Sequence, residues 1–207
     1  MRRADVEDAA HAAARDAFPI PHPSEFALPP GELWVFGYGS LMWDPGFPYV
    51  KWAPALVYGY HRALCVYSTR WRGTARRPGL VLGLDRGGAC RGIAYQVATD
   101  DVDTALTGLW AREMRRRVYE PRLMRARLAG HETRVLTFVA NVEHPGYAGR
   151  LSVEETARLV ATCHGERGSN IDYLTRTIDH LTELGVRDHN LLGVLAAVRA
   201  LHPSAPG

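Results

Sequence analysis

One acidic side chain occupies a position where the sequence predicts the apolar face of a helix. From Asp100 to Met114 apolar residues recur at helical spacing, and Glu113 falls seven residues beyond Leu106 and four beyond Leu109, in the middle of that face. A carboxyl group among apolar side chains is costly to ionise, so its pKa rises toward the range useful to a general base. Glu113 is therefore the best catalytic candidate. The alternative is that the helix ends near Met114 and Glu113 pairs with an arginine at its rim.

A glycine-rich stretch is the second feature that suits chemistry. Leu33 to Phe36 is an apolar, β-branched and aromatic run that predicts a short buried strand, and it stops at Gly37-Tyr-Gly-Ser40. Glycines on both sides of Tyr38 allow the chain to point several backbone N–H groups at one place, which suits an anion or an oxyanion. The alternative is an ordinary glycine turn in a hairpin.

Three familiar motifs are excluded at this stretch. A dinucleotide-binding loop needs a third glycine where Met42 stands, and no Gly-Lys-Ser/Thr tripeptide provides a phosphate-binding loop. A nucleophile elbow needs glycine two residues on either side of its serine, but Ser40 has Tyr38 and Met42 there. We therefore do not expect Ser40 to be a nucleophile.

The cysteines and histidines give no support to a disulfide framework or a metal site. Cys65, Cys90 and Cys163 are far apart and form no Cys-x-x-Cys pair, which indicates reduced thiols, and the first two lie in or beside apolar runs as small hydrophobic residues do. The nine histidines show no ligand spacing. We predict no metal site.

Composition and charge exclude further classes. The 207 residues are 46% hydrophobic and 23% charged, as in a soluble globular protein, and the net charge of +3 is too mild to indicate a nucleic-acid partner. No apolar run approaches the ~18 residues of a membrane span. The start, Met1-Arg-Arg-Ala, lacks the apolar core of a secretory signal, and the acidic residues that follow argue against a transit peptide. We predict a cytoplasmic protein.

The order of elements predicts an α+β fold. Strands are followed by one helix, by a second group of strands and by three helices, which favours a curled sheet that encloses a pocket with helices packed outside it. The predicted strands are 33–36, 55–68, 79–84, 92–98, 119–128 and 133–140, with a turn at Asp85-Arg-Gly-Gly88. The predicted helices are 100–114, 152–164, 170–184 and 188–201, the second opened by the capping box Ser152-x-x-Glu155 and ended by 165–169. Thr99 or Asp100 is expected to cap the first.

Residues 1–31 differ from the rest of the chain. An alanine-rich stretch over 4–17 predicts a helix, and five prolines between 18 and 30 predict an extended arm. We therefore divide the chain into this N-terminal segment and a domain over 32–202.

Arginines concentrate in two places. The irregular loop Trp71–Pro78 is basic, and its Arg72, with Arg62 as a second candidate, suits a substrate carboxylate; the alternative is a solvated loop. Six further arginines lie between 115 and 127, where no exposed aromatic residues alternate with them, so we interpret them as a solvated face before a nucleic-acid surface. Arg112, Arg115 and Arg116 lie off the apolar stripe and are expected at the surface.

Eight motifs in unbroken order from about residue 33 to 201 resemble the ChaC-like γ-glutamylcyclotransferases. They are Phe36-Gly-Tyr-Gly-Ser-Leu-Met-Trp43, Gly59-Tyr-His-Arg62, Ser68 through Arg72-Gly-Thr74, Pro78-Gly79, Cys90-Arg-Gly-Ile-Ala-Tyr95, Leu109-Trp-Ala-Arg-Glu-Met114, His144-Pro-Gly-Tyr147 and Gly168-Ser-Asn-Ile-Asp-Tyr-Leu174. The resemblance implies a mixed β-barrel with surrounding helices that cleaves glutathione to 5-oxoproline and cysteinylglycine without metal or organic cofactor.

The resemblance also assigns roles to individual residues. The family's γ-glutamyl-binding loop maps to Tyr38, Gly39, Ser40 and Leu41, and its catalytic glutamate maps to Glu113, the residue that helical periodicity singles out. Two other interpretations remain open. One is a cyclotransferase for other γ-glutamyl amino acids or amines, and the other is a non-enzymatic binding module of the same fold.

The chain departs from the family pattern at one turn. Close relatives usually have a glycine-containing turn after Arg-Glu-Met, whereas this chain has Arg115-Arg-Arg-Val118. We expect the helix to continue by a turn there and the rim of the pocket to be more basic, which affects substrate preference more than catalysis.

Overall fold

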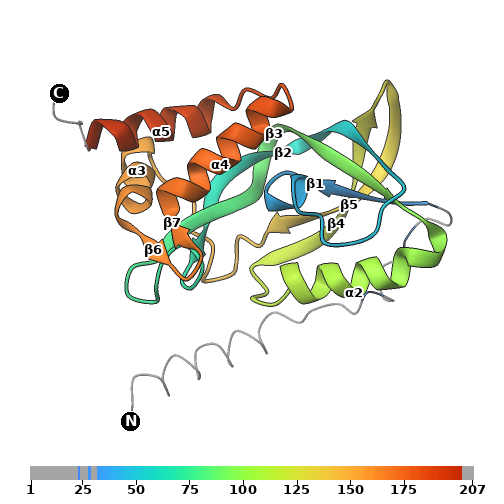
Figure 1. Cartoon of the computed structure of the whole chain (residues 1–207), viewed down its shortest axis with the longest axis horizontal. Helices are drawn as coiled ribbons and strands as arrows, with labels where there is room; N and C mark the ends of the chain where they lie inside the picture. The colour runs from blue at the N-terminus through green and yellow to red at the C-terminus, as the bar shows by residue number, and fades with distance from the viewer. Residues whose placement is uncertain (1–22, 24–27, 29–31, 202–207) are drawn as a thin grey trace, which may run out of the picture.

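The computed structural model describes residues 23, 28 and 32–201, and its centre is a closed barrel (Figure 1). Around the barrel the strands follow the order β1-β3-β2-β4-β5. All neighbours are antiparallel except β1 and β5, which are parallel and meet at Val35 and Leu136. The strands are β1 (Leu33–Gly37), β2 (Lys51–Ser68), β3 (Gly79–Val97), β4 (Tyr119–Leu128) and β5 (His131–Ala140). This confirms the predicted α+β class and the mixed barrel.

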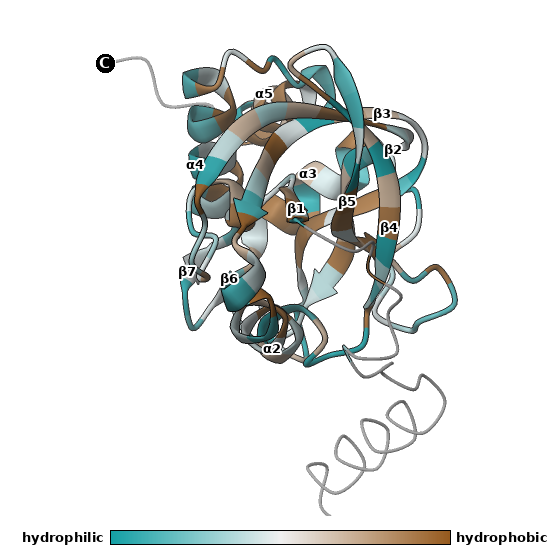
Figure 2. Ribbon diagram, turned by 90° about the vertical axis from the view of Figure 1, so that its right-hand side faces the viewer, coloured by the Kyte–Doolittle hydropathy of each residue, from teal (hydrophilic) through white to brown (hydrophobic). Residues whose placement is uncertain are grey.

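Alternating apolar side chains of the strands fill the interior. Val35, Leu80, Leu136 and Phe138 are all 0–1% exposed, and the ribbon coloured by hydropathy shows apolar residues along the strands that surround the centre (Figure 2). The barrel is therefore a packed core rather than a channel, and the chemistry has to take place at its edge.

Four α-helices occur in the described residues. They are α2 (Val102–Glu113), α3 (Val153–Thr162), α4 (Asn170–Glu183) and α5 (His189–Leu201). The last three pack on one another, and α3 and α4 also pack on β3, whereas α2 lies apart from them beside the barrel (Figure 1). The predicted capping box of α3 is confirmed, because Ser152 Oγ accepts from the Glu155 N–H and the Glu155 carboxylate accepts from the Ser152 N–H.

Three local predictions are wrong. The turn at 85–88 is absent, because β3 continues through it: Gly87 and Gly88 have φ of +101° and +73°, and the pairing register shifts there opposite Gly59, whose φ is +82°. Glycines absorb such a bulge without breaking the strand. Residues 165–169 are not a simple helix terminator, since β6 (His164–Gly165) and β7 (Gly168–Ser169) pair there.

The third concerns the ends of α2. A 3₁₀ turn over Thr99–Asp101 precedes it, without a side-chain cap. The helix ends at Glu113 instead of continuing, and Arg117 adopts a φ of +57° in the turn that follows. Arg117 lies three residues beyond the C-cap residue Met114, and its N–H donates to the Met114 carbonyl oxygen at 3.1 Å, which closes a turn after the helix. The turn expected from the family is therefore retained, with an arginine where glycine would be less strained.

The predicted N-terminal helix and extended arm fall almost entirely outside the described residues. The division of the chain at residue 31 therefore stays a prediction.

A buried asparagine ties α4 to the barrel. Asn170 is 0% exposed, its Nδ2 donates to the Leu80 carbonyl oxygen at 2.7 Å and its Oδ1 accepts from the Leu80 N–H at 2.6 Å. Asn170→Ala leaves both backbone groups buried without partners, so we expect the free energy of unfolding to fall by about 2–4 kcal/mol. Urea denaturation measures this loss. The exposed Asn190→Ala is the control, and an equal effect of the two substitutions would contradict the assignment.

Candidate active site

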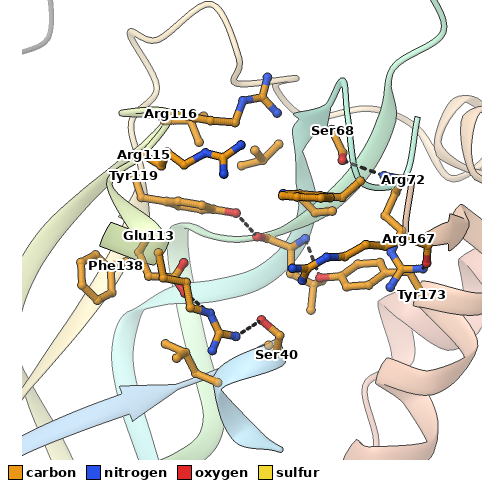
Figure 3. A pocket seen from close by; sticks show the side chains of 18 of the residues that line it. Ser40, Ser68, Arg72, Glu113, Arg115, Arg116, Tyr119, Phe138, Arg167 and Tyr173 are labelled. Carbon is orange, nitrogen blue, oxygen red and sulfur yellow. Dashed lines mark hydrogen bonds and ion pairs between the residues drawn. The ribbon is translucent and has the colours of Figure 1, made fainter. Parts of the chain in front are cut away.

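A pocket of about 490 Å³ opens at the barrel where several segments of the chain meet. Its walls come from the strands β2, β3 and β5, the loop after β1, the β2–β3 connection, the end of α2, the start of β4, the β6–β7 turn and α4. In Figure 3, Ser40 and Glu113 lie near each other at one end, and Arg72 and Arg116 lie toward the other. The volume is that of a small-molecule site.

The glycine stretch forms one wall. Tyr38, Gly39, Ser40 and Leu41 all line the pocket, and Ser40–Met42 form a 3₁₀ turn. A Cβ on Gly37 would lie 2.9 Å from the Leu41 Cβ, so this close turn requires glycine. The hairpin alternative is wrong, because the strand that follows β1 in the chain, β2, is not its neighbour in the barrel. All four predicted loop residues thus face one cavity.

Glu113 lies at the last position of α2 and faces the same pocket. Its side chain is 17% exposed, and burial raises the pKa of the carboxyl above its usual value while the neighbouring Arg112 lowers it. The predicted desolvated acid is confirmed. The alternative, an acid at the helix end paired with an arginine, is also partly right, because Arg112 Nε lies 3.1 Å from Glu113 Oε1.

Arg112 connects the acid to the glycine loop, a role that its position off the apolar stripe did not predict. Besides Glu113, its guanidinium donates to Ser40 Oγ at 2.9 Å and to the Asp44 carbonyl oxygen at 2.6 Å. As predicted, Arg112 and Arg115 are exposed at the surface, and Arg116 is partly buried, but all three also line the pocket. Their positions lie off the stripe that faces the core, but the pocket approaches the helix end from that side.

Three tyrosines, Tyr38, Tyr119 and Tyr173, line the same pocket as the acid. Burial holds the pKa values of Tyr38 and Tyr119 well above their usual value, with Tyr119 and then Glu113 as further causes for Tyr38 and Glu113 as the next cause for Tyr119, and burial raises the pKa of Tyr173 to about 12. Tyr119 donates to the Leu82 carbonyl oxygen at 2.8 Å, and Tyr173 accepts from the Leu82 N–H at 3.2 Å (Figure 3). Because their pKa values are raised, the three phenols stay neutral. They therefore help to bury the carboxyl without placing a second negative charge in the pocket. Tyr173 belongs to the last of the eight motifs, which was the available signal for it.

The two predicted carboxylate-binding arginines have different outcomes. Arg72 lines the pocket, with Nη1 donating to the Arg167 carbonyl oxygen at 2.5 Å and the guanidinium 5.2 Å from the Tyr173 ring centre. The expectation for Arg62 is wrong, because Arg62 is 4% exposed and forms no part of the pocket. It donates to the Tyr38 carbonyl oxygen at 2.5 Å and pairs with Asp188 at 3.0 Å, so it supports the loop from behind.

The cysteines lie outside the chemistry. All three are free and buried, and burial raises the pKa of Cys65 to about 12 and that of Cys90 to about 11, which opposes a thiolate. Among the described residues no group of His, Cys, Asp and Glu side chains is arranged to hold a metal ion. No helix in the same part of the chain has the length and apolar character to cross a membrane.

The protein is a small mixed barrel whose pocket contains a largely buried glutamate and a glycine loop. Comparisons with known proteins identify the family to which the chain belongs. Residues 33–201 match the sequence model described as ChaC-like protein, so the chain belongs to this family. It is 36% identical over 172 residues to the glutathione-specific gamma-glutamylcyclotransferase of Escherichia coli K12, covering 83% of this chain and 74% of the relative. It is 35% identical over 193 residues to glutathione-specific gamma-glutamylcyclotransferase 1 of Mus musculus, covering 84% of this chain and 81% of the relative.

A solved structure agrees on the fold. The crystal structure of the yeast gamma-glutamyl cyclotransferase specific to glutathione superposes with a TM-score of 0.76 at 21% identity, covering 85% of this chain and 100% of the yeast chain. The barrel with its helices is therefore the architecture of the family.

Proposed function

We propose that this protein cleaves glutathione to 5-oxoproline and cysteinylglycine, with Glu113 as general base and then general acid. The observation that carries the proposal is the Glu113 carboxyl, 17% exposed and with a raised pKa, in a pocket that the glycine loop also lines. The E. coli and mouse relatives are named as glutathione-specific, which supports the choice of substrate.

The reaction begins with a proton transfer. The α-ammonium group of the γ-glutamyl residue gives a proton to Glu113, and the freed amine attacks the γ-carbonyl carbon of the same residue. Nucleophile and electrophile belong to one molecule, so the site has only to hold the folded conformer, an orientation effect that contributes about 7–11 kcal/mol. The tyrosine rings and the loop exclude water from the acid.

The second half of the reaction returns the proton. Attack produces a tetrahedral oxyanion, for which we propose the backbone N–H groups of the Gly39–Leu41 segment as donors, each such donor contributing about 3–4 kcal/mol. Glu113 then protonates the amide nitrogen as its bond to the γ-carbon breaks, and the ring nitrogen loses its second proton through the same carboxylate to the released amine, which leaves as an ammonium group. No water is consumed, since the products together have the composition of glutathione. Proton transfer and hydrogen bonding suffice, which is the basis for proposing a cofactor-independent reaction.

Two finer assignments belong to the same proposal. Arg72 retains guanidinium nitrogens beyond the one that contacts Arg167 and Ser169, and we assign it to a substrate carboxylate, while the Tyr38–Leu41 loop holds the γ-glutamyl group. Three free cysteines, all buried, fit a reducing compartment and support a cytoplasmic location.

The products test the proposal directly. Purified protein incubated with reduced glutathione should release 5-oxoproline and cysteinylglycine in equal amounts, measured by mass spectrometry. A cyclotransferase of different scope would act on other γ-glutamyl amino acids or amines and leave glutathione intact. No turnover of any γ-glutamyl compound by the folded protein would favour a binding module and refute the proposal.

Arg112 should set the pH at which the enzyme becomes active. The second-order rate constant kcat/KM rises with pH as Glu113 loses its proton, and the Arg112 charge lowers the pKa of that carboxyl. Arg112→Gln removes this effect, so the acidic limb of the kcat/KM profile should move to higher pH. Arg122→Gln, which breaks an exposed pair with Glu120 outside the pocket, is the control. An unmoved limb in Arg112→Gln would contradict the assignment.

A further inference from the structure

The pocket has more positive charge than the proposed chemistry uses. Five arginines line it, against the carboxyl groups of Asp44 and Glu113. Three of the five already have partners within the protein. Arg112 contacts Ser40 and Glu113, Arg72 donates to backbone carbonyl groups, and Arg116 donates to Tyr67 O at 3.2 Å and Thr69 Oγ1 at 2.9 Å.

The other two arginines share one aromatic ring. The Arg167 guanidinium carbon lies 4.3 Å from the Trp71 ring centre, and that of Arg115 lies 5.5 Å from it. Within residues 32–201, neither guanidinium makes a hydrogen bond or an ion pair in the structure. Stacking on an aromatic ring fixes a guanidinium while its N–H edge stays available to a planar anion.

The fold brings these side chains together from distant parts of the chain. Trp71 follows β2, Arg115 lies in the turn after α2, and Arg167 lies between β6 and β7. The β6–β7 turn is fixed to the Trp71 segment by two backbone bonds, Glu166 N–H to Arg70 O at 2.9 Å and Arg167 N–H to Trp71 O at 3.0 Å. Arg115 belongs to the departure from the family's usual turn, so this chain adds a charge to a wall that the fold holds in place.

We propose that Trp71, Arg115 and Arg167 form a subsite for the carboxylate at the far end of the leaving group. The proposal rests on the proposed function and deepens it, because it specifies the substrate class: γ-glutamyl peptides whose leaving group ends in a free carboxylate. With the γ-glutamyl group held at Glu113 and the glycine loop, the C-terminal carboxylate of a tripeptide lies two residues beyond the bond that breaks. The subsite selects such substrates over γ-glutamylamines, which have no such anion.

The test compares glutathione with its C-terminal glycinamide, which has the same shape without the terminal charge. Wild-type protein should prefer glutathione by about ten- to a hundred-fold in kcat/KM, since charge-assisted pairs are worth that much. In the Arg115→Gln/Arg167→Gln double variant this preference should fall toward unity, because the KM for glutathione rises while kcat is retained. Arg70→Gln is the matched control, because Arg70 also stacks on Trp71, at 4.6 Å, but pairs with Glu166 and does not line the pocket.

The outcomes separate the subsite from the reaction. Equal turnover of the two compounds by wild-type protein, or an equal loss of preference in Arg70→Gln, overturns the subsite and leaves the cyclotransferase reaction standing. If wild-type protein turns over neither compound, the proposed function fails, and calorimetric binding to the same proteins decides the subsite. Tighter binding of glutathione than of its glycinamide, lost in the double variant, supports it, whereas equal binding or none overturns it.

Discussion

Glu113→Gln should reduce kcat for glutathione by about 10²–10⁴-fold, the range that a positioned acid–base group contributes. Glutamine preserves the size of the side chain but can neither accept the ammonium proton nor return one to the leaving nitrogen. Because the side chain is only 17% exposed and its charged form is disfavoured by burial, the neutral amide should leave the fold intact. Steady-state kinetics of product release, with calorimetric binding of glutathione, measures both properties.

The matched control is Glu120→Gln. Glu120 also pairs with an arginine, Arg122 at 2.6 Å, but it lies on β4 outside the pocket with 37% of its side chain exposed. We expect unchanged kinetics in this variant. Substantial activity in Glu113→Gln would remove Glu113 from the mechanism, whereas lost binding would assign it to substrate recognition.

Arg62→Met should destabilise the protein by about 3–5 kcal/mol, the cost of leaving one partner of a buried ion pair alone. The Arg62 side chain is 3% exposed and that of Asp188, its partner at 3.0 Å, is 13% exposed. The same guanidinium donates to the Arg91 carbonyl oxygen at 2.6 Å and to that of Tyr38, so its loss also leaves acceptors behind the glycine loop without a donor. Guanidinium chloride denaturation gives the difference.

An exposed pair provides the comparison for Arg62. Arg70 and Glu166 lie 2.8 Å apart with side chains 50% and 56% exposed, so Arg70→Met should cost less than about 1 kcal/mol. The two ion pairs have similar lengths, so the larger loss of stability expected for Arg62→Met comes from the burial of its pair. Similar midpoints of guanidinium chloride denaturation for Arg62→Met and Arg70→Met would show that the buried pair contributes no more to stability than the exposed one.

The catalytic candidate could be predicted because its signal is local. Helical spacing alone places Glu113 on an apolar face, and a carboxyl there has few physical explanations. The glycine loop was similarly visible, since the close turn at Gly37 requires a missing side chain. The positions at which strands end and turns begin were less predictable. Gly87 and Gly88 indicated a turn, but a bulge in a long strand uses the same backbone angles, and only pairing with Gly59 distinguishes the two.

The rest of the site depends on tertiary contacts that no spacing encodes. Arg112 lies off the core-facing stripe and was expected at the surface, yet the loop after β1 folds back to meet it at Ser40. Tyr119 and Tyr173 both form hydrogen bonds with the backbone of one β3 residue, Leu82, although the two tyrosines are far apart in sequence. Arg62 was misassigned for the same reason, because its partner Asp188 is 126 residues away.

The central claim is that the substrate's own amine, and not water, attacks the γ-carbonyl in the pocket of Glu113. Mass spectrometry of the reaction carried out in H₂¹⁸O tests this claim most directly. Intramolecular attack retains the original carbonyl oxygen, so the 5-oxoproline formed from glutathione should contain no ¹⁸O. Release of ¹⁸O-labelled glutamate, or of 5-oxoproline that carries the label, would show hydrolysis and would contradict the mechanism.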